Sequence, residues 1–368
     1  MKDHKSFIDA SVAFQCSPQD GVEMRVTSSS LDYAQRALSG MAIVWDHKTQ
    51  QPTAHNGWHL NGNEIGKNGH AVNMTKTLGA LNGILSFSPD FTFIVDMADH
   101  RARSIVDANN HSAPVFCFNR RKSNNSGKIL WPLPGYQDLG TDDFLGPPNL
   151  RKIAFEDKMS KVIWRGSAGG WARLGKFGRG KMKRFFPLLR AYENQKLTLE
   201  ETKAALSTTW RHRFVENNLH NPQFDVGYTN ITDRPGHTYS LLEPYEKEKV
   251  SQKNQTKFKY IAVLPGADVG SNFYWVMNSS SLGLVMEADF DSFASDHFKP
   301  WKHYVPVKPD LSDLSKNLAW CDDNPDKVKS MIRNANEVCD MLSDASMRQS
   351  ILNGVIRATE ERLVKNSV

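Results

Sequence analysis

The chain has 368 residues, of which 46 are Lys or Arg and 40 are Asp or Glu, giving a formal net charge of +6. This length exceeds a typical single core and fits two domains of about 150 to 200 residues each. The mild positive charge favours anionic ligands without requiring nucleic acid. The four cysteines lack C-x-x-C spacing, which excludes a disulfide framework or a structural zinc site of the usual pattern and indicates a reducing compartment.

The N-terminus carries charges but no apolar signal region, and no run approaches the ~18 apolar residues that span a bilayer. We therefore expect a cytoplasmic protein. Any membrane contact would be peripheral.

The first predicted unit is a helix followed by a buried strand. Met74, Leu78, Leu81 and Leu85 recur at helical spacing, and an apolar run follows at 91–97. Further apolar runs stand at 113–119, 161–164, 259–265, 282–287 and 303–307. Most are continuous rather than alternating, as in strands that helices cover on both faces. The chain is therefore predicted to be a parallel α/β protein.

Two aspartates lie at the end of the strand predicted at 91–97. Asp96 and Asp99 in "IVDMADH" would lie at the carboxyl end of that strand, where parallel sheets place their chemistry. Asp is also a common turn residue, so each aspartate alone fits an ordinary turn equally well.

The stretch at 131–149, "WPLPGYQDLGTDDFLGPPN", is rich in Pro, Gly and Asp and separates two sets of helix–strand units. We place the domain boundary here. The predicted domains are 1–140 and 141–342, followed by a C-terminal helix at 343–368.

The strand at 161–164 runs into "RGSAGGWAR", which places Arg165, Ser167 and Arg173 around two pairs of small residues. Glycines let backbone N–H groups approach a phosphate, and arginines supply a forked permanent charge. This stretch therefore predicts an anion site. It is not the G-x-S-x-G nucleophile turn, because Arg165 occupies the place of the first glycine.

Two other patterns are weaker. "GKFGRGKM" at 175–182 resembles a P-loop, but Met182 stands where Ser or Thr would coordinate magnesium, so a basic turn is the better interpretation. His55 and His59 have metal-ligand spacing, but glycine interrupts the helix and no glutamate lies between them.

Asp289 and Asp291 form an Asp-x-Asp pattern. Some sugar-nucleotide enzymes hold a metal ion with this pattern. It also fits a solvated loop, since a hard cation needs several convergent oxygens.

The strand at 259–265 continues into "PGADVGSNFYW", a glycine-rich turn with Ser271 as the expected N-cap of a helix. Free N–H groups at such a helix start make a second phosphate-binding candidate, although a plain capped helix fits as well.

The last conspicuous stretch is 298–314, "FKPWKHYVPVKPDLSDL", and it contains a strand followed by a helix start. Its polar residues near these elements are Lys299, Lys302, His303, Lys308, Asp310, Ser312 and Asp313. Two helical patterns, at 331–342 and 347–355, end the chain.

Taken in order, "IVDMADH", "APVFCF", "WRGSAGGWAR", "KYIAVLPGADVGS" and "FKPWKHYVPVKPDLSDL" resemble the successive motifs of glycosyltransferase family 90. This family includes capsule-associated xylosyltransferases, lipopolysaccharide-modifying transferases and Rumi-type protein O-glucosyltransferases. The resemblance runs from about residue 75 to residue 340.

The resemblance implies a GT-B-like fold of two Rossmann-like domains, with acceptor binding in 1–140 and nucleotide-sugar binding in 141–342. It implies an inverting transfer, without metal or other cofactor, of glucose or xylose from a UDP-sugar to a glycan or glycolipid. Lipopolysaccharide and capsule are the expected acceptors.

The resemblance also implies roles for individual residues. Asp99 matches the catalytic base, and Ser167 and Arg173 match contacts to the donor diphosphate. The full expected set of donor-binding residues is Arg165, Ser167, Arg173, Gly266, Ala267, Asp268, Val269, Gly270, Ser271 and His303. Supporting roles are expected for Asp96, Asn272, Tyr304 and Asp313.

The sequence departs from the family pattern at Phe273. Protein-glucosylating members carry Ser-Phe-Arg where this chain has Ser271-Asn272-Phe273. His303 and Arg165 are the neighbours that would replace the missing arginine, unless the donor is held differently. The cysteine-rich region and retention signal of the secretory members are not found in this sequence, which favours envelope or capsule glycan assembly.

Two alternatives remain open. One is a lapsed transferase that binds sugar nucleotides or glycans. The other is a basic surface for nucleic acid or membrane, because 165–190 contains eight Lys or Arg residues. Under the transferase hypothesis no nucleic-acid partner is expected.

Overall fold

The computed structural model describes residues 4–16, 21–38, 42–54, 59–61, 64–67, 70–73, 75–99, 103–135, 145–147, 149–174, 182–266 and 268–363. The chain divides into two compact units. Unit 1 comprises Met1–Phe144, Asp289–His297 and Asp340–Val368, and unit 2 comprises Leu145–Ala288 and Phe298–Cys339. The predicted boundary at residues 140 and 141 lies outside the described residues.

Unit 1 is built on a five-stranded sheet with the order β11-β9-β7-β2-β3. β7 and β9 pair in parallel, as do β9 and β11, whereas β2 runs antiparallel to both of its neighbours. The strands are β2 (Ile43–Asp46), β3 (Gln51–Ala54), β7 (Phe93–Val95), β9 (Val115–Cys117) and β11 (Lys128–Leu130). β7 and β9 confirm the strands predicted at 91–97 and 113–119.

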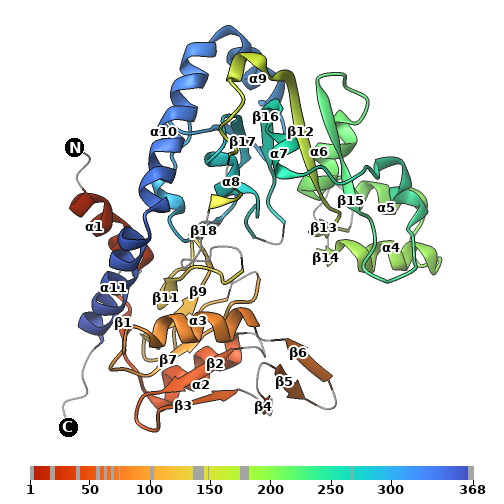
Figure 1. The fold of residues 1–368 in the computed structure, drawn as a ribbon. Coiled ribbons are helices and arrows are strands. Elements are labelled where there is room, and N and C mark those ends of the chain that lie inside the picture. Colours follow the sequence, from red (N-terminus) through yellow and green to blue (C-terminus); the bar gives the residue numbers. More distant parts are fainter. Residues whose placement is uncertain are drawn as a thin grey trace. The chain divides into compact units, whose positions relative to one another are not determined.

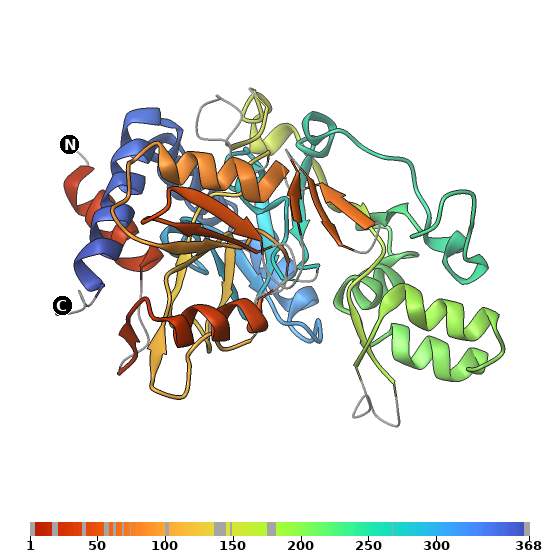
Figure 2. The same ribbon diagram turned by 90° about the horizontal axis from the view of Figure 1, so that it is seen from below.

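Helices cover both faces of this sheet, which explains why β7 and β9 are apolar at every position. Figure 2 shows α3 (Thr75–Leu85) and α2 (Ser28–Ala37) on opposite faces. α3 confirms the first predicted helix, of which Met74 lies outside the described residues.

A strand from a distant part of the sequence completes unit 1. β18 (Phe290–Ser292) pairs antiparallel with β10 (Asn119–Arg121), which explains why 289–297 belong to this unit. The remaining elements are α1 (His4–Gln15), β1 (Glu23–Met24), β4 (His59–Asn61), β5 (Glu64–Lys67), β6 (His70–Asn73), β8 (His111–Ser112), η5 (Ser295–His297) and α11 (Ala345–Arg362). α10 (Pro325–Ser343) and α11 confirm the two helical patterns at the end of the sequence.

Unit 2 contains a five-stranded sheet in which every neighbouring pair is parallel, with the order β15-β12-β16-β17-β19. Four strands confirm predicted ones, and β15 was not predicted. The strands are β12 (Met159–Ser167), β15 (Phe224–Asn230), β16 (Phe258–Val263), β17 (Leu282–Met286) and β19 (Val305–Val307). This mixed α/β architecture confirms the predicted α/β class and is consistent with Rossmann-like domains, but β2 and β3 of unit 1 depart from the expected parallel pairing.

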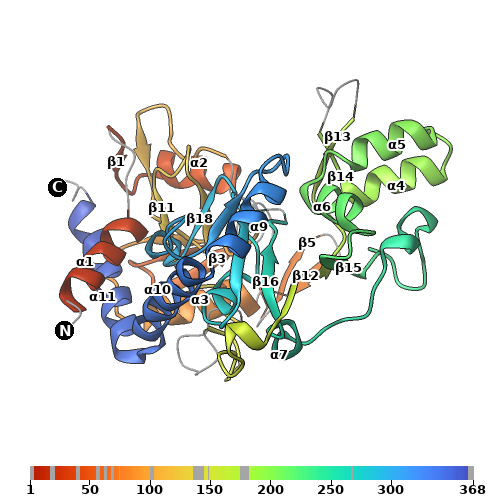
Figure 3. The same cartoon turned by 90° about the horizontal axis from the view of Figure 1, so that it is seen from above.

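A hairpin and three helices are inserted between β12 and β15 (Figures 1 and 3). They are β13 (Trp171–Arg173), β14 (Met182–Arg184), α4 (Phe185–Glu193), α5 (Leu199–Leu206) and α6 (Trp210–Asn218). The other helices of unit 2 are η2 (Phe155–Asp157), η4 (Ser240–Tyr245), α7 (Gln252–Gln255), α8 (Phe273–Met277) and α9 (Leu314–Asp323).

Arg120 on β10 is fully buried and holds the C-terminus of α1 in place. Its guanidinium donates to the main-chain oxygens of Phe14 and Gln15, and to that of Lys128 at 3.0 Å. Its Nε lies 3.9 Å from Asp291 on β18. One buried cation therefore satisfies carbonyl groups that the end of α1 leaves without helical partners.

We expect Arg120→Met to destabilise unit 1 by about 3–5 kcal/mol, because three buried main-chain carbonyls lose their charged donor. Scanning calorimetry measures this destabilisation as a lower melting temperature of the transition in which unit 1 unfolds. Arg121→Met is the matched control: Arg121 is partly exposed, 3.6 Å from Asp289, so its loss costs below about 1 kcal/mol. Equal shifts for the two variants would contradict the role of Arg120.

Candidate functional site

The carboxyl ends of two neighbouring parallel strands form the centre of the site in unit 2. β12 ends at Ser167 and β16 ends at Val263, and the loops that follow them meet. A Cβ atom placed on Gly170 would lie 3.9 Å from the main-chain oxygen of Gly266. The structure thus brings together the two phosphate-binding stretches that the sequence indicated.

Two glycines turn the chain away from β12. Gly169 and Gly170 have φ angles of +147° and +113°, which other residues rarely adopt. A Cβ on Gly170 would also lie 3.1 Å from Cγ2 of Thr209. The turn therefore lies close to the start of α6.

Arg211, in the first turn of α6, joins the two strand ends. Its Nη1 donates to the main-chain oxygen of Ser167 at 3.2 Å, and Nη2 lies 3.5 Å from that of Leu264. A Cβ on Gly266 would lie 2.8 Å from Nη2, so glycine is what allows this close approach. The guanidinium carbon lies 5.9 Å from the ring centroid of Trp164.

The Nε atom of Arg211 is buried and has no hydrogen-bond partner among the described residues. Burial lowers the pKa of the guanidinium, while the Tyr228 hydroxyl and the Asp268 carboxylate act in the opposite direction. A buried N–H without an acceptor costs free energy, which an anionic ligand would recover.

The N-terminus of α6 adds backbone donors at the same place. Thr209 is the N-cap, but its side chain makes no capping bond. The first helical bond runs from the Arg213 N–H to the Thr209 oxygen at 2.9 Å, so the preceding N–H groups have no acceptor within the helix. Together with Arg211, these groups can bind a phosphate or another oxyanion.

Arg211 is not among the residues predicted from the sequence. One signal was present: Thr209 is a suitable N-cap, and an arginine two residues later is repelled by the positive end of the helix dipole. A cation in that position gains from an anionic neighbour. The inserted helices obscured this signal, because they separate Arg211 from Ser167 by more than forty residues.

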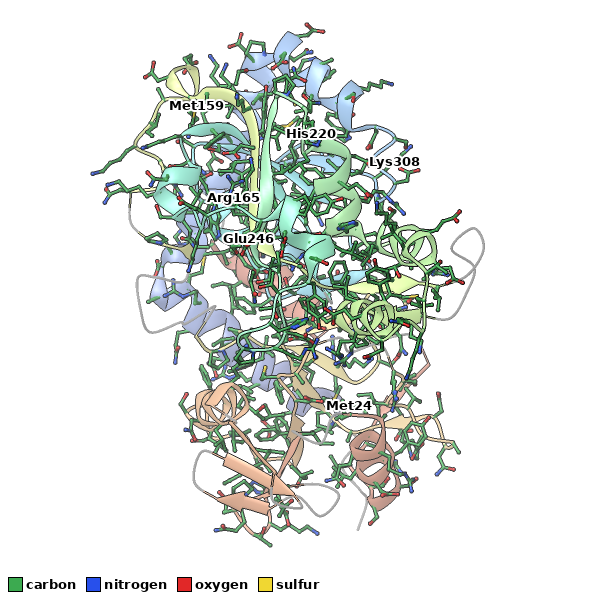
Figure 4. All side chains as sticks on the ribbon, turned by 90° about the vertical axis from the view of Figure 1, so that its right-hand side faces the viewer. Met24, Met159, Arg165, His220, Glu246 and Lys308 are labelled. Carbon is green, nitrogen blue, oxygen red and sulfur yellow. The ribbon has the colours of Figure 1, made fainter. Side chains whose placement is uncertain are left out.

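Arg165, a predicted donor contact, makes hydrogen bonds within unit 2. Its Nη2 lies 2.6 Å from Oδ1 of Asp225, and Nη1 donates to the main-chain oxygens of Asp225 and Trp164. Its Nε donates to the oxygen of Glu248, close to Glu246 (Figure 4). Arg165 and Lys247 hold the pKa of the Asp225 carboxyl below its usual range, although burial of that carboxyl opposes them.

Ser167 and Arg173 are both exposed. Ser167 ends β12 and lies beside Asn230 of β15 after a shift in register. Arg173 lies beyond the glycine turn on β13, where its N–H donates to Oγ1 of Thr208 at 2.7 Å.

The turn after β16 folds back on its own strand. A Cβ on Gly270 would lie 2.7 Å from Val263 Cγ1, and Asp268 is buried with Oδ1 accepting the N–H of Val269 at 2.6 Å. Gly266 lies against Arg211, as described above. Ala267 lies outside the described residues.

The expected N-cap at Ser271 is wrong. Asn272 is the N-cap of α8, but its side chain accepts no helical N–H. Its Nδ2 donates to the main-chain oxygen of Ala262 at 2.9 Å. α8 is only five residues long. The helix start at the strand ends is therefore that of α6.

Phe273, at the position of the missing arginine, packs in an aromatic cluster. Its ring centroid lies 5.3 Å from that of Phe298 and 6.2 Å from that of Tyr304. Tyr304 is buried, which raises its pKa to about 12. Phe273 therefore has a packing role.

His303 is one of the two neighbours expected to replace the missing arginine. It is buried, its Nδ1 accepts the Lys299 N–H at 2.7 Å, and its ring lies against Phe298. Burial lowers the pKa of the imidazole, and Lys302 lowers it further. Asp313 is the N-cap of α9, but its Oδ1 accepts the Lys308 N–H at 3.0 Å.

Asp96 and Asp99 follow β7 in unit 1, as predicted. Asp96 is fully buried, and its Oδ1 accepts the Ala98 N–H at 3.2 Å. Asp99 is exposed at the carboxyl end of this strand. Its position suits a group that meets a substrate.

The remaining sequence patterns do not form a site in the described part of the chain. Asp289 and Asp291 face Arg121 and Arg120, and no group of three or more metal-ligating residues occurs among the described residues. No helix in the described ranges is long and apolar enough to cross a membrane. The basic turn at 175–181 and His55 lie outside the described residues, as does the side chain of His59.

Comparison with known proteins supports the resemblance. Residues 204–347 match the model of glycosyl transferase family 90. This segment includes Arg211 and the turn at 264–272, but not Asp99 or 164–173.

Several curated proteins are similar to this chain. It is 29% identical over 136 residues to O-glucosyltransferase LpsA of Dichelobacter nodosus, covering 37% of this chain and 41% of LpsA. It is 28% identical over 129 residues to human protein O-glucosyltransferase 3, covering 33% and 24%. It is 26% identical over 250 residues to protein O-glucosyltransferase 2 of Danio rerio, covering 66% and 42%. The matched regions span less than half the length of each relative.

His212 anchors the helix that carries Arg211. It is buried, its Nδ1 lies 3.2 Å from the hydroxyl of Tyr228 on β15, and its Nε2 lies 3.8 Å from Glu216. Burial lowers the pKa of the imidazole to about 4, although Glu216 opposes this. His212 is thus neutral in the folded protein at pH 7.

We expect the free energy of unfolding to fall as the pH drops from about 6.5 towards 4, by on the order of 3 kcal/mol. In this window the unfolded chain protonates His212 and the folded chain does not, so protons favour unfolding. Urea titrations at pH 7.0 and 4.5 measure the difference, and His212→Gln should reduce it. An unchanged pH dependence in His212→Gln would contradict this origin.

Proposed function

Because this chain belongs to glycosyl transferase family 90, we propose that it transfers a sugar from a UDP-sugar to a hydroxyl group of a glycan acceptor. Glucose and xylose are the sugars we favour, and the transfer inverts the anomeric centre without a metal ion. The names of LpsA and of the protein O-glucosyltransferases support a glucosyl donor. We favour a lipopolysaccharide or capsule acceptor, which the name LpsA also supports.

We further propose that the two units are the two Rossmann-like domains of a GT-B enzyme, with the nucleotide bound by unit 2. The parallel sheet of unit 2 supports this assignment, since α/β domains bind nucleotides at the carboxyl ends of their strands. The four cysteines are buried, which suits a cytoplasmic location.

One observation carries the proposal: Arg211 and the start of α6 lie at the carboxyl ends of β12 and β16. A UDP-sugar has a diphosphate that needs such donors. We assign the diphosphate to Arg211 in preference to Arg173, because the guanidinium of Arg211 lies between the strand ends. Ser167 and the turn at 266–271 remain expected donor contacts.

The charges of this site suit departure of UDP. When the bond between the sugar C1 and the diphosphate oxygen breaks, negative charge grows on the leaving group. Arg211 and the N–H groups of α6 offset that charge, and they are held in place before the reaction begins.

We assign the role of base to Asp99. The acceptor hydroxyl gives its proton to the Asp99 carboxylate as its oxygen bonds to C1 from the face opposite the diphosphate. Such proton transfer contributes roughly 10²–10⁴-fold to the rate. Asp96 is buried, lies three residues before Asp99 and would support it.

The first test is a panel of UDP- and GDP-sugars, with and without EDTA, read by donor hydrolysis and thermal shift. We expect one UDP-sugar to stabilise the protein regardless of EDTA, and Arg211→Gln to lower kcat/KM by roughly 10²–10³-fold. Arg173→Ala should have a smaller effect.

Arg213→Gln is the matched control, because Arg213 lies on the same helix as Arg211. Its guanidinium donates to the main-chain oxygens of Ser207 and Pro309. It should cost stability but keep donor binding. No response to any donor would favour a lapsed, glycan-binding protein. An EDTA-sensitive response would favour Asp289 and Asp291 as metal ligands.

We expect Asp99→Asn to bind the donor normally but to lose roughly 10²-fold or more of its transfer rate, because an amide cannot accept the proton. Isothermal titration with UDP and a transfer assay separate the two effects. Turnover at the wild-type rate would move the role of base to Asp96 or another group.

A further inference from the structure

The hairpin formed by β13 and β14 presents an unusual mixture of side chains. Trp171 lies opposite Arg184, Ala172 opposite Lys183, and Arg173 opposite Met182. Because side chains alternate across a hairpin, Trp171, Arg173, Met182 and Arg184 share one face. We call Trp171, Arg173, Met182, Lys183 and Arg184 the basic hairpin.

The cations of the basic hairpin make no ion pair with an acidic residue in the described ranges. Between 165 and 192 the sequence contains eight Lys or Arg residues and no Asp or Glu. Arg165 and Arg190 pair with Asp225 and Asp233 from other segments. Arg173, Lys183 and Arg184 are exposed and make no ion pair with a described residue.

An apolar group lies among these charges. Met182 is 44% exposed. The Arg184 guanidinium lies 5.5 Å from the ring centroid of Trp171, which is itself half-buried. A cationic surface with exposed apolar and aromatic groups suits the boundary between water and lipid headgroups.

We propose that the basic hairpin binds the surface of an anionic lipid bilayer. The cations point to both faces of the hairpin, since Lys183 lies opposite buried Ala172, so they cannot converge on one phosphate group. A diffuse array of charge is attracted by a surface of many anionic headgroups. Met182 gains further when the interface removes it from water.

The position of the hairpin gives this binding a purpose, which rests on the proposed function. The hairpin begins at Gly170, beside Gly266 and the start of α6. Docking it on a bilayer would hold the donor site of unit 2 near acceptors carried on lipids.

The test is co-sedimentation of the full chain with vesicles of phosphatidylglycerol and phosphatidylcholine in equal parts. We expect binding that is lost with pure phosphatidylcholine. It should also be lost in 0.5 M NaCl, because salt screens the attraction between exposed charges. The triple variant Arg173→Gln, Lys183→Gln, Arg184→Gln should bind roughly 100-fold more weakly, at ~5-fold per charge. Met182→Gln should bind more weakly without a change in net charge.

The matched control is Lys203→Gln, Lys253→Gln, Lys257→Gln, which removes the same charge from exposed positions elsewhere in unit 2. It should bind vesicles within a few-fold of wild type. Equal losses in the two triple variants would show that net charge alone acts, and would overturn the proposal. So would tight binding of the wild type to RNA with none to the anionic vesicles. Neither result bears on donor binding, which the sugar-nucleotide panel measures separately.

Discussion

The site of unit 2 depends on the parallel pairing of β12 with β16. Because the two strands run in the same direction, their carboxyl ends meet at one edge, and the carbonyls of Ser167 and Leu264 point out beyond the sheet. Arg211 lies between these carbonyls. Without that pairing, neither the guanidinium nor the start of α6 would have a fixed place.

The insertion between β12 and β15 delivers Arg211 to this edge. Its helices pack on the same core as the sheet, and His212 contacts Tyr228 on β15 from the position next to Arg211. The glycines at 169 and 170 let the chain leave β12 without blocking α6. An added hairpin and helices thus supply the cation, in place of a residue next to the strand.

Buried arginines in this chain have distinct tasks that their sequence neighbours do not reveal. Arg120 satisfies the end of α1, and Arg165 joins β12 to Asp225. Arg211 joins the carboxyl ends of β12 and β16 through the main-chain oxygens of Ser167 and Leu264. The difference lies in the acceptors that tertiary packing places around each guanidinium.

Much of the architecture followed from the sequence, because continuous apolar runs such as 259–265 and 282–287 have one stable environment, a sheet covered on both faces. The strand-end position of Asp99 followed in the same way. Ser271 was a poor guide to the helix cap, because α8 begins one residue later than expected, with Asn272 as its N-cap.

Tertiary structure alone decided which arginines could meet a ligand. Arg165 lies near the end of a strand and Arg211 near the start of a helix, and local sequence gives no reason to separate the two cations. Asp225 comes to Arg165 from a neighbouring strand, whereas Arg211 makes its hydrogen bonds to main-chain oxygens of the described residues Ser167 and Leu264. Such partners are set by contacts between distant segments, which local patterns do not encode.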